Sequence, residues 1–369
     1  MLKIPSYIKF FIILFGLIMI FYVMIVGRAI FVPLITAFIF ALILQPLSSR
    51  LEKWKFPRGL SSIVSIIAIF AVLFFTFYYI SYQVRSISRD LSEIGEKFEG
   101  FVDRGHDWME ENFGVEESEQ TAYLKNSIND FVTSSTSILT STLSATAGFF
   151  TAFVLIFISL FFLLYYRSFF VEFLYRAISD KHHQKLTDSI YRVSSVVRAY
   201  VLGLFTVILI LAVLNTTGLM LLGIEHAMFF GALAAMLTII PYIGIFIGSL
   251  LPILFALLTK DSLWYPLGVA ILFWGIQFLE GNFITPNIVG NKVSLNPFAV
   301  IVALFLGGMV WGAIGMILAI PIVAALKVIF DVVDPLKPYG FLLGYPKDDN
   351  ETNENTKVEK RLTKVKEKV

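Results

Sequence analysis

Apolar runs long enough to cross a bilayer recur along this 369-residue chain and constrain its fold more than any other feature. An α-helix needs about 20 consecutive apolar residues to cross the hydrocarbon core of a membrane. Hydrophobic residues make up 57% of the chain and charged residues only 15%, whereas a typical soluble domain carries about 25% charge. The sequence therefore predicts an all-α polytopic membrane protein with the lipid bilayer as a partner. The clear candidates for single spans are residues 8–26, 31–47, 63–82, 147–166, 201–222 and 265–279.

Two further apolar runs are longer than one ordinary span and contain residues that interrupt helices. Residues 227–258 contain IPYIG at positions 240–244, and residues 298–330 contain GAIGMILAIP at positions 312–321. Each run follows one complete span, and a span followed by a broken segment, occurring twice, is typical of inverted-repeat transporters. We therefore expect two re-entrant hairpins, broken at Pro and Gly, in a protein of about eight membrane segments. Two long unbroken helices are the alternative, and they would place residues 282–296 on the other side of the membrane.

Charge asymmetry predicts the orientation of the chain. Residues 48–61 carry four basic residues against one acidic residue, and residues 167–199 carry six against three. Residues 83–145, in contrast, carry five basic residues against twelve acidic residues. Because cytoplasmic loops are enriched in Lys and Arg, we expect the two basic segments and both termini in the cytoplasm and the acidic segment outside.

These features divide the chain into five parts. Residues 84–101 repeat apolar side chains every three or four positions, which predicts an amphipathic helix that associates with a second copy or packs on its own subunit or on lipid headgroups. A second amphipathic helix, 186–197, is expected to lie along the cytoplasmic interface. The Lys-rich tail after Tyr345 is expected to be disordered or at most a loose helix. The expected parts are three N-terminal spans in 1–82, an extracytoplasmic helical segment in 83–145, the fourth span and the interfacial helix in 146–199, a transport core of two span-plus-hairpin repeats in 200–335 and a charged tail in 336–369.

Signatures of enzymes and of cofactor sites do not occur in the sequence. It contains no GxSxG, HExxH, Walker A or GxGxxG motif, and no cysteine for a disulfide or a thiolate metal site. His182 and His183 lie in a charged segment, which favours a solvated loop over a metal site. The charges cluster in short loops and the tail and indicate no nucleic-acid partner. We therefore expect no enzyme, no metal and no cofactor, and transport driven by a gradient or by a partner.

Polar side chains around the second broken run are candidates for a solute pathway. Glu280 lies where the sixth span meets an Asn-rich segment, with Gln277 on the same helical face. An ionisable group at membrane depth is a functional hypothesis by default because its burial is costly; an interfacial carboxylate facing water is the alternative. Asn215 and Thr216 lie inside the fifth span, where their polar atoms need hydrogen-bond partners.

Amides and hydroxyls suit a small, polar, largely uncharged solute, although each Asn taken alone is more typical of a loop turn or a helix cap. The predicted pathway consists of Gln277, Glu280, Asn282, Asn287, Asn291, Asn215 and Thr216. Prolines remove a backbone donor and glycines admit conformations that other residues avoid, which predicts hinges; close helix packing at the glycines is the alternative. The predicted hinge or helix-breaking residues are Pro241, Gly244, Pro286, Gly290, Pro297, Gly312, Gly315 and Pro321.

Three motifs carry a resemblance to a known family. EGN at 280–282 is followed by PNIVGNKVSLNP at 286–297, and together with IPYIG and GAIGMILAIP it resembles the signature of the autoinducer-2 exporter family of bacterial permease-like proteins. The resemblance covers nearly the whole chain. It implies a transporter with about eight membrane segments, some of them re-entrant, that forms a homo-oligomer in the bacterial inner membrane. Family members often carry His where this chain has Asn296, and this departure argues against a proton role at that position.

The favoured interpretation is a secondary transporter that exports a small polar molecule, with the quorum-sensing signal autoinducer-2 as the candidate that the resemblance implies. Antiport of sodium or lithium against protons through Glu280 is the alternative, and the shortage of carboxylates within the spans counts against it. A membrane scaffold that binds partners through residues 83–145 is a third hypothesis.

Overall fold

A computed structural model describes residues 5–76, 78–79, 81–83, 146–240, 243–260, 262–290 and 294–345. These residues form helices joined by short turns, and no strand occurs among them. The all-α class predicted from the sequence is confirmed. The amphipathic helix predicted for residues 84–101 and most of the charged tail lie outside the described residues.

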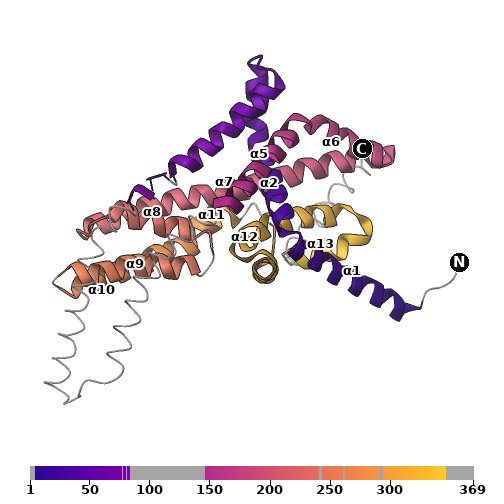
Figure 1. Ribbon diagram of the computed structural model, residues 1–369. Helices are drawn as coiled ribbons and strands as arrows, with labels where there is room; N and C mark the ends of the chain where they lie inside the picture. The colour runs from indigo at the N-terminus through magenta and orange to yellow at the C-terminus, as the bar shows by residue number, and fades with distance from the viewer. Residues whose placement is uncertain are drawn as a thin grey trace, which may run out of the picture.

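All of the N-terminal helices except the first pack together around one apolar core. α1 (Ser6–Val26) is exposed along its length and extends away from the other helices, as Figure 1 shows. α2 (Arg28–Lys53), the helix Arg58–Gln83 and α5 (Thr146–Tyr165) share a core that contains Ala41, Ile66 and Leu160. Small residues at such an interface let helices approach closely.

α7 (His183–Leu221) is the central helix of the bundle, and α6 (Arg167–Ala177) and a short 3-10 helix, η1 (Asp180–His182), precede it. α5 and α6 are bent by 67° relative to each other. With 39 residues, α7 is about 58 Å long at 1.5 Å per residue. It joins the predicted interfacial helix and the fifth span without a break, and Val197 on its first half is buried in a cluster with Ile39 and Leu318.

The first broken run folds back on itself as hairpin 1, which consists of α8 (Ala227–Leu237) and α9 (Ile243–Thr259). A methyl group at Gly244 would lie 1.6 Å from the Leu237 carbonyl oxygen, and one at Gly248 would lie 2.9 Å from Cα of Ala234. Further from the turn, the rings of Phe230 and Phe255 are 5.0 Å apart. The two helices are therefore antiparallel, and the absent side chain of Gly244 lets them meet at the turn.

The second broken run also reverses its direction. α12 (Pro297–Val332) contains Gly312 with φ 64° and ψ −144°, a left-handed conformation that favours glycine. A methyl group at Gly307 would lie 2.4 Å from the Gly315 carbonyl oxygen and 2.9 Å from Cβ of Ala319. A straight helix would separate residues 307 and 319 by about 18 Å, so α12 is a hairpin, called hairpin 2 below, with its turn at Gly312.

The two hairpins are anchored at opposite ends of α7. At the base of hairpin 1, Lys260 Nζ lies 3.9 Å from a Glu225 carboxylate oxygen, just after the C-terminal end of α7. At the base of hairpin 2, Asp334 lies 3.9 Å from Lys185 in the first turn of α7. Figure 1 shows α8, α9 and α10 gathered toward one end of α7 and α12 and α13 toward the other. This arrangement is the one expected of inverted repeats.

By length and apolar composition, six of the described helices are long enough to cross a membrane, or seven if the bent α5–α6 pair is one span. α12 is among the six although it reverses at Gly312, while the shorter helices of hairpin 1 are not. The predicted number of about eight membrane segments therefore agrees only approximately with the six or seven candidate spans among the described residues.

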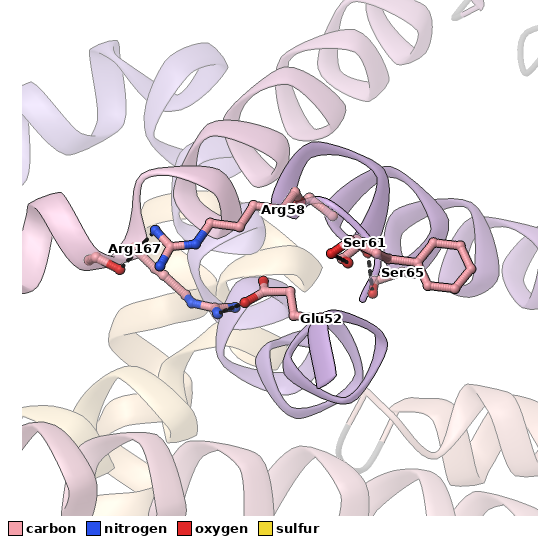
Figure 2. Close-up of polar contacts among 8 residues, drawn as sticks. Glu52, Arg58, Ser61, Ser65 and Arg167 are labelled. Atoms are coloured by element: carbon pink, nitrogen blue, oxygen red, sulfur yellow. Dashed lines mark hydrogen bonds and ion pairs between the residues drawn. The ribbon is translucent and has the colours of Figure 1, made fainter. Parts of the chain in front are cut away.

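The two basic segments of the sequence lie together at one end of the bundle. Figure 2 shows Arg167, at the start of α6, facing Glu52 near the end of α2, with 2.5 Å between Arg167 Nη2 and Glu52 Oε2. Arg58 Nη1 donates to the Ser168 hydroxyl over 3.4 Å. Nearby, the fully buried Ser65 hydroxyl donates to the Ser61 carbonyl over 2.7 Å. Segments 48–61 and 167–199 therefore share one side, as the charge asymmetry requires; which side of the membrane this is stays a prediction.

Candidate functional site

A carboxylate held by two neutral donors lies where α10 (Trp264–Leu279) passes into the π-helical segment η2 (Glu280–Ile284). Gln277 Nε2 donates to Glu280 Oε2 over 2.6 Å, and the Thr285 hydroxyl donates to Glu280 Oε1. All three side chains are half-buried. Among the described residues, hydrogen bonds and no cation stabilise the carboxylate.

The π-helical turn explains why Thr285 reaches Glu280. Residues five positions apart lie on different faces of an α-helix, but a π-helix makes its hydrogen bonds between residues i and i+5. Pro286 follows in α11 (Thr285–Ile288) and has no N–H to donate to the Asn282 carbonyl four residues earlier. The hydrogen bond from the Thr285 N–H to the Glu280 carbonyl closes the π-helical turn just before Pro286. Such π-helical insertions occur frequently at functional sites.

Asn282 and Asn287 lie on the exposed surface of the same segment. Asn282 Nδ2 donates to the Phe278 carbonyl over 2.9 Å, and Asn287 Nδ2 donates to the Phe283 carbonyl over 2.7 Å. Each amide therefore supplies a donor to a backbone carbonyl four residues earlier and leaves its own oxygen available. The polar segment is helical as far as Ile288, so its first half is not the irregular chain that its Asn, Gly and Pro content suggests. Asn291 lies outside the described residues.

Asn215 and Thr216 lie in the second half of α7, apart from Glu280. Asn215 is 3% exposed, and its Oδ1 atom has no hydrogen-bond partner among the described residues. Thr216 lies against hairpin 1, where a methyl group at Gly231 would lie 2.3 Å from the Thr216 hydroxyl. The structure thus places Thr216 at the contact between α7 and α8, with Asn215 next to it in α7.

α10 and the segment that follows it run antiparallel to α7, which separates the two sets of pathway residues. A methyl group at Gly218, near the end of α7, would meet Leu272 in α10. One at Gly203, earlier in α7, would meet Ile288 and Val289, which come later than α10. Glu280 lies between these two contacts, and Asn215 lies close to the first. The structure does not bring Asn215 and Glu280 into one group.

The predicted hinge residues fall into distinct positions. Gly244, Gly312 and Gly315 lie at the hairpin turns or between the two arms, as described above. Pro286 lies inside a helical segment, Gly290 lies just after it, and Pro321 is buried in the second arm of hairpin 2. Pro297 is the first residue of α12, a position where its missing N–H costs nothing. Pro241 lies outside the described residues, and hinge motion at all of these positions stays a prediction.

Asn296 ties the start of hairpin 2 to α13 (Lys337–Leu343), which follows η4 (Asp334–Leu336). Its Oδ1 accepts a hydrogen bond from the Ala299 N–H over 2.8 Å and so caps α12. Its Nδ2 donates to the carbonyls of Leu342 and Gly344 over 2.7 and 2.9 Å. Both ends of the amide are used, so this residue has a structural role at the base of the hairpin.

Asn296→Asp is expected to release α13 while keeping the helix cap. The carboxylate still accepts from Ala299, but it cannot donate and would face two carbonyl oxygens. Loss of hydrogen bonds of this kind costs about 1–3 kcal/mol, so amide hydrogen exchange in residues 337–345 should accelerate by roughly tenfold or more. Hydrogen exchange of the full chain checks this, with hairpin 1 as the internal reference. Unchanged exchange in α13 would show that the Asn296 amide does not hold it.

Taken together, the long apolar helices, the two oppositely anchored hairpins and the polar π-helical turn define a polytopic membrane protein of the transporter class. The chain belongs to the AI-2E transporter family, whose model matches residues 11–334. It is 26% identical over 316 residues to "Putative transport protein YrrI" of Bacillus subtilis, covering 82% of this chain and 86% of YrrI. It is also 26% identical over 316 residues to "Putative transport protein YueF" of the same organism, covering 81% of this chain and 83% of YueF. A "Putative transport protein" of Borreliella burgdorferi is 33% identical over 132 residues, covering 34% of this chain and 35% of that protein.

Thr285 was not among the residues predicted for the pathway. Its position, five residues after Glu280, gives no signal as long as an ordinary α-helix is assumed. A proline six residues after a carboxylate, within a helix that otherwise continues, is the feature that could have indicated the altered turn.

Proposed function

We propose that this chain is a secondary transporter that exports a small, polar, largely uncharged molecule. The observation that carries the proposal is the pair of hairpins anchored at opposite ends of α7. In inverted-repeat transporters the solute site lies between such broken segments, and one repeat moves against the rest. Under this proposal the two span-plus-hairpin repeats form the moving part, and α2, the helix Arg58–Gln83 and α5 form the frame.

Gln277, Glu280 and Thr285, called the Glu280 group below, are the proposed contact for the solute. Removing a polar solute from water requires replacement hydrogen bonds, and this segment offers the Glu280 carboxylate and the amide oxygens of Asn282 and Asn287. Asn215 is proposed as a second polar station at the contact with hairpin 1, because its buried Oδ1 has no partner among the described residues.

The substrate proposed is autoinducer-2, and the support is the family to which the chain belongs. We further propose that the chain forms a homo-oligomer in the bacterial inner membrane with both termini in the cytoplasm. The grouping of the basic segments 48–61 and 167–199 at one end of the bundle supports this orientation.

Flux through the purified full chain in proteoliposomes tests the proposal. Vesicles loaded with autoinducer-2 are diluted into buffer with or without a pH or sodium gradient, and the signal released is measured over time. Protein-free vesicles and vesicles with an unrelated membrane protein of similar size serve as controls. Protein-dependent release is the expected result.

Two other results would contradict the exporter and support a different function. Proton movement on adding sodium or lithium, without release of autoinducer-2, would overturn the exporter and support antiport. No flux of either kind, with partner binding that depends on residues 83–145, would instead support a scaffold.

A further inference from the structure

A large cavity lies apart from the Glu280 group, at the end of the bundle that carries the basic segments. Its volume is about 850 Å³, within the ~300–1,000 Å³ range of sites that hold small organic ligands. α2, α5, α6, the first half of α7 and the end of hairpin 2 all contribute to its wall. The cavity thus lies where the N-terminal helices meet hairpin 2.

Most of the residues that line the cavity are apolar, and Phe38, Val193 and Ile329 are among them. Lys185 in the first turn of α7 and Asp334, just after α12, also line it. Their side chains are 54% and 67% exposed, so they lie at the solvent-exposed edge of the cavity, called the mouth below. An alkyl chain would be well accommodated along the apolar walls.

Two lysines lie at unequal distances from the Asp334 carboxylate at the mouth of the cavity. Lys337 Nζ lies 2.6 Å from one Asp334 carboxylate oxygen, while Lys185 Nζ lies 3.9 Å from the other. The hydrogen bond from Lys337, together with the nearby charge of Lys185, holds the pKa of the Asp334 carboxyl below its ordinary value. Because Lys337 already neutralises Asp334, the more distant Lys185 ammonium is available to a negatively charged group at the mouth.

α6, which lines the cavity, has the features of a helix at a membrane interface. It is bent by 67° from α5, and Phe169 and Phe173 are 63% and 61% exposed on its surface. A helix that combines such exposed aromatic residues with Arg167 and Arg176 is typical of the membrane interface.

We propose that this cavity binds one acyl chain of an anionic phospholipid, with the lipid phosphate at Lys185. The apolar walls of the cavity select the chain, and the ammonium group of Lys185 selects the negative headgroup. The site is independent of the Glu280 group and of the identity of the transported solute.

Native mass spectrometry of the purified full chain tests the proposal. The protein is equilibrated in detergent with equal amounts of phosphatidylglycerol and phosphatidylcholine, and the retained lipid is quantified. We expect roughly fivefold or greater preference for phosphatidylglycerol, which corresponds to about 1 kcal/mol. Inorganic phosphate at millimolar concentration should not displace the lipid; displacement would overturn the role of the acyl chain and indicate a site for a free anion.

Two variants with matched controls locate the lipid. Leu174→Trp adds bulk to a residue that lines the cavity, and it should lower the retained phosphatidylglycerol severalfold. Phe169→Trp introduces the same residue on the same helix outside the cavity lining and should change nothing. Lys185→Gln should lower the preference between the two lipids, whereas Arg176→Gln, which removes an exposed arginine paired with Glu172, should not.

The outcomes are decisive even where one variant folds poorly. Lys185 is 54% exposed, so its substitution should leave the fold intact, as the elution volume and circular dichroism of the variant would show. Equal retention of both lipids by the wild type would overturn the selection of an anionic headgroup. Wild-type retention of phosphatidylglycerol by Leu174→Trp would overturn the location.

Discussion

Gly315→Ala is expected to prevent hairpin 2 from closing. A methyl group at this position would lie 1.9 Å from the Gly307 carbonyl oxygen, and the opposing atom is backbone, which cannot move away without separating the arms. Overpacking in a core costs about 1–3 kcal/mol where side chains can adjust, and a backbone clash should cost more. We expect a large loss of monodisperse protein and an apparent melting temperature lowered by 10 °C or more, roughly in line with a loss of several kcal/mol.

Gly308→Ala is the matched control for this substitution. The same added methyl group at Gly308 would meet the flexible Met316 side chain and not backbone, with Cε at 2.6 Å and Cγ at 3.3 Å. This variant should therefore purify and melt nearly as the wild type does. Thermal unfolding followed by size-exclusion chromatography measures both variants. Equal stability of Gly315→Ala and Gly308→Ala would contradict the close contact between the two arms.

Glu280→Gln is expected to leave the protein folded and to reduce transport by roughly tenfold or more. Glutamine keeps the size of the side chain but replaces one acceptor oxygen with a donor, which would face Gln277 or Thr285. A hydrogen bond to a charged group contributes about 1.5–3 kcal/mol, equivalent to a factor of about 10 to 150. The measurement is the initial rate of solute release from proteoliposomes that contain equal amounts of protein, and the expectation depends on the proposed function.

Two further variants separate a specific role from a general loss of charge. Thr285→Val removes the hydroxyl that donates to Glu280 and should reduce the rate in the same direction, and the double variant should be less impaired than the two effects combined. Glu172→Gln removes a carboxylate on the surface of α6, paired with Arg176 over 2.5 Å, and should transport normally. A wild-type rate for Glu280→Gln would remove Glu280 from the solute pathway.

The helix class and the positions of both chain reversals could be predicted from local sequence. IPYIG and GAIGMILAIP interrupt apolar runs that are too long for a single span, and the structure reverses the chain just before Gly244 and at Gly312. These predictions succeeded because a turn between two close helices requires residues without side chains, and glycine is recognisable in a sequence.

The arrangement around Glu280 could be predicted only in part. The contact with Gln277 follows from their spacing on an α-helix, but the contact with Thr285 depends on a π-helical turn, for which Pro286 is only an indirect signal in the sequence. In the same way, the apolar face of residues 186–197 is compatible with lipid or with protein. Only the folded chain shows Val197 in a cluster with Ile39 and Leu318.

The opposite entry of the two hairpins is the central structural claim, and single cysteines test it most directly because the natural chain has none. Leu263→Cys lies between hairpin 1 and α10, Ser294→Cys lies just before hairpin 2, and Lys337→Cys marks the expected cytoplasmic side under either topology. Each variant is treated in oriented vesicles with a membrane-impermeant maleimide. Two re-entrant hairpins predict that Ser294→Cys reacts from the same side as Lys337→Cys and that Leu263→Cys reacts from the opposite side. Labelling of Leu263→Cys from the side of Lys337→Cys, with Ser294→Cys on the other side, would show that both segments cross the membrane completely and would contradict the account.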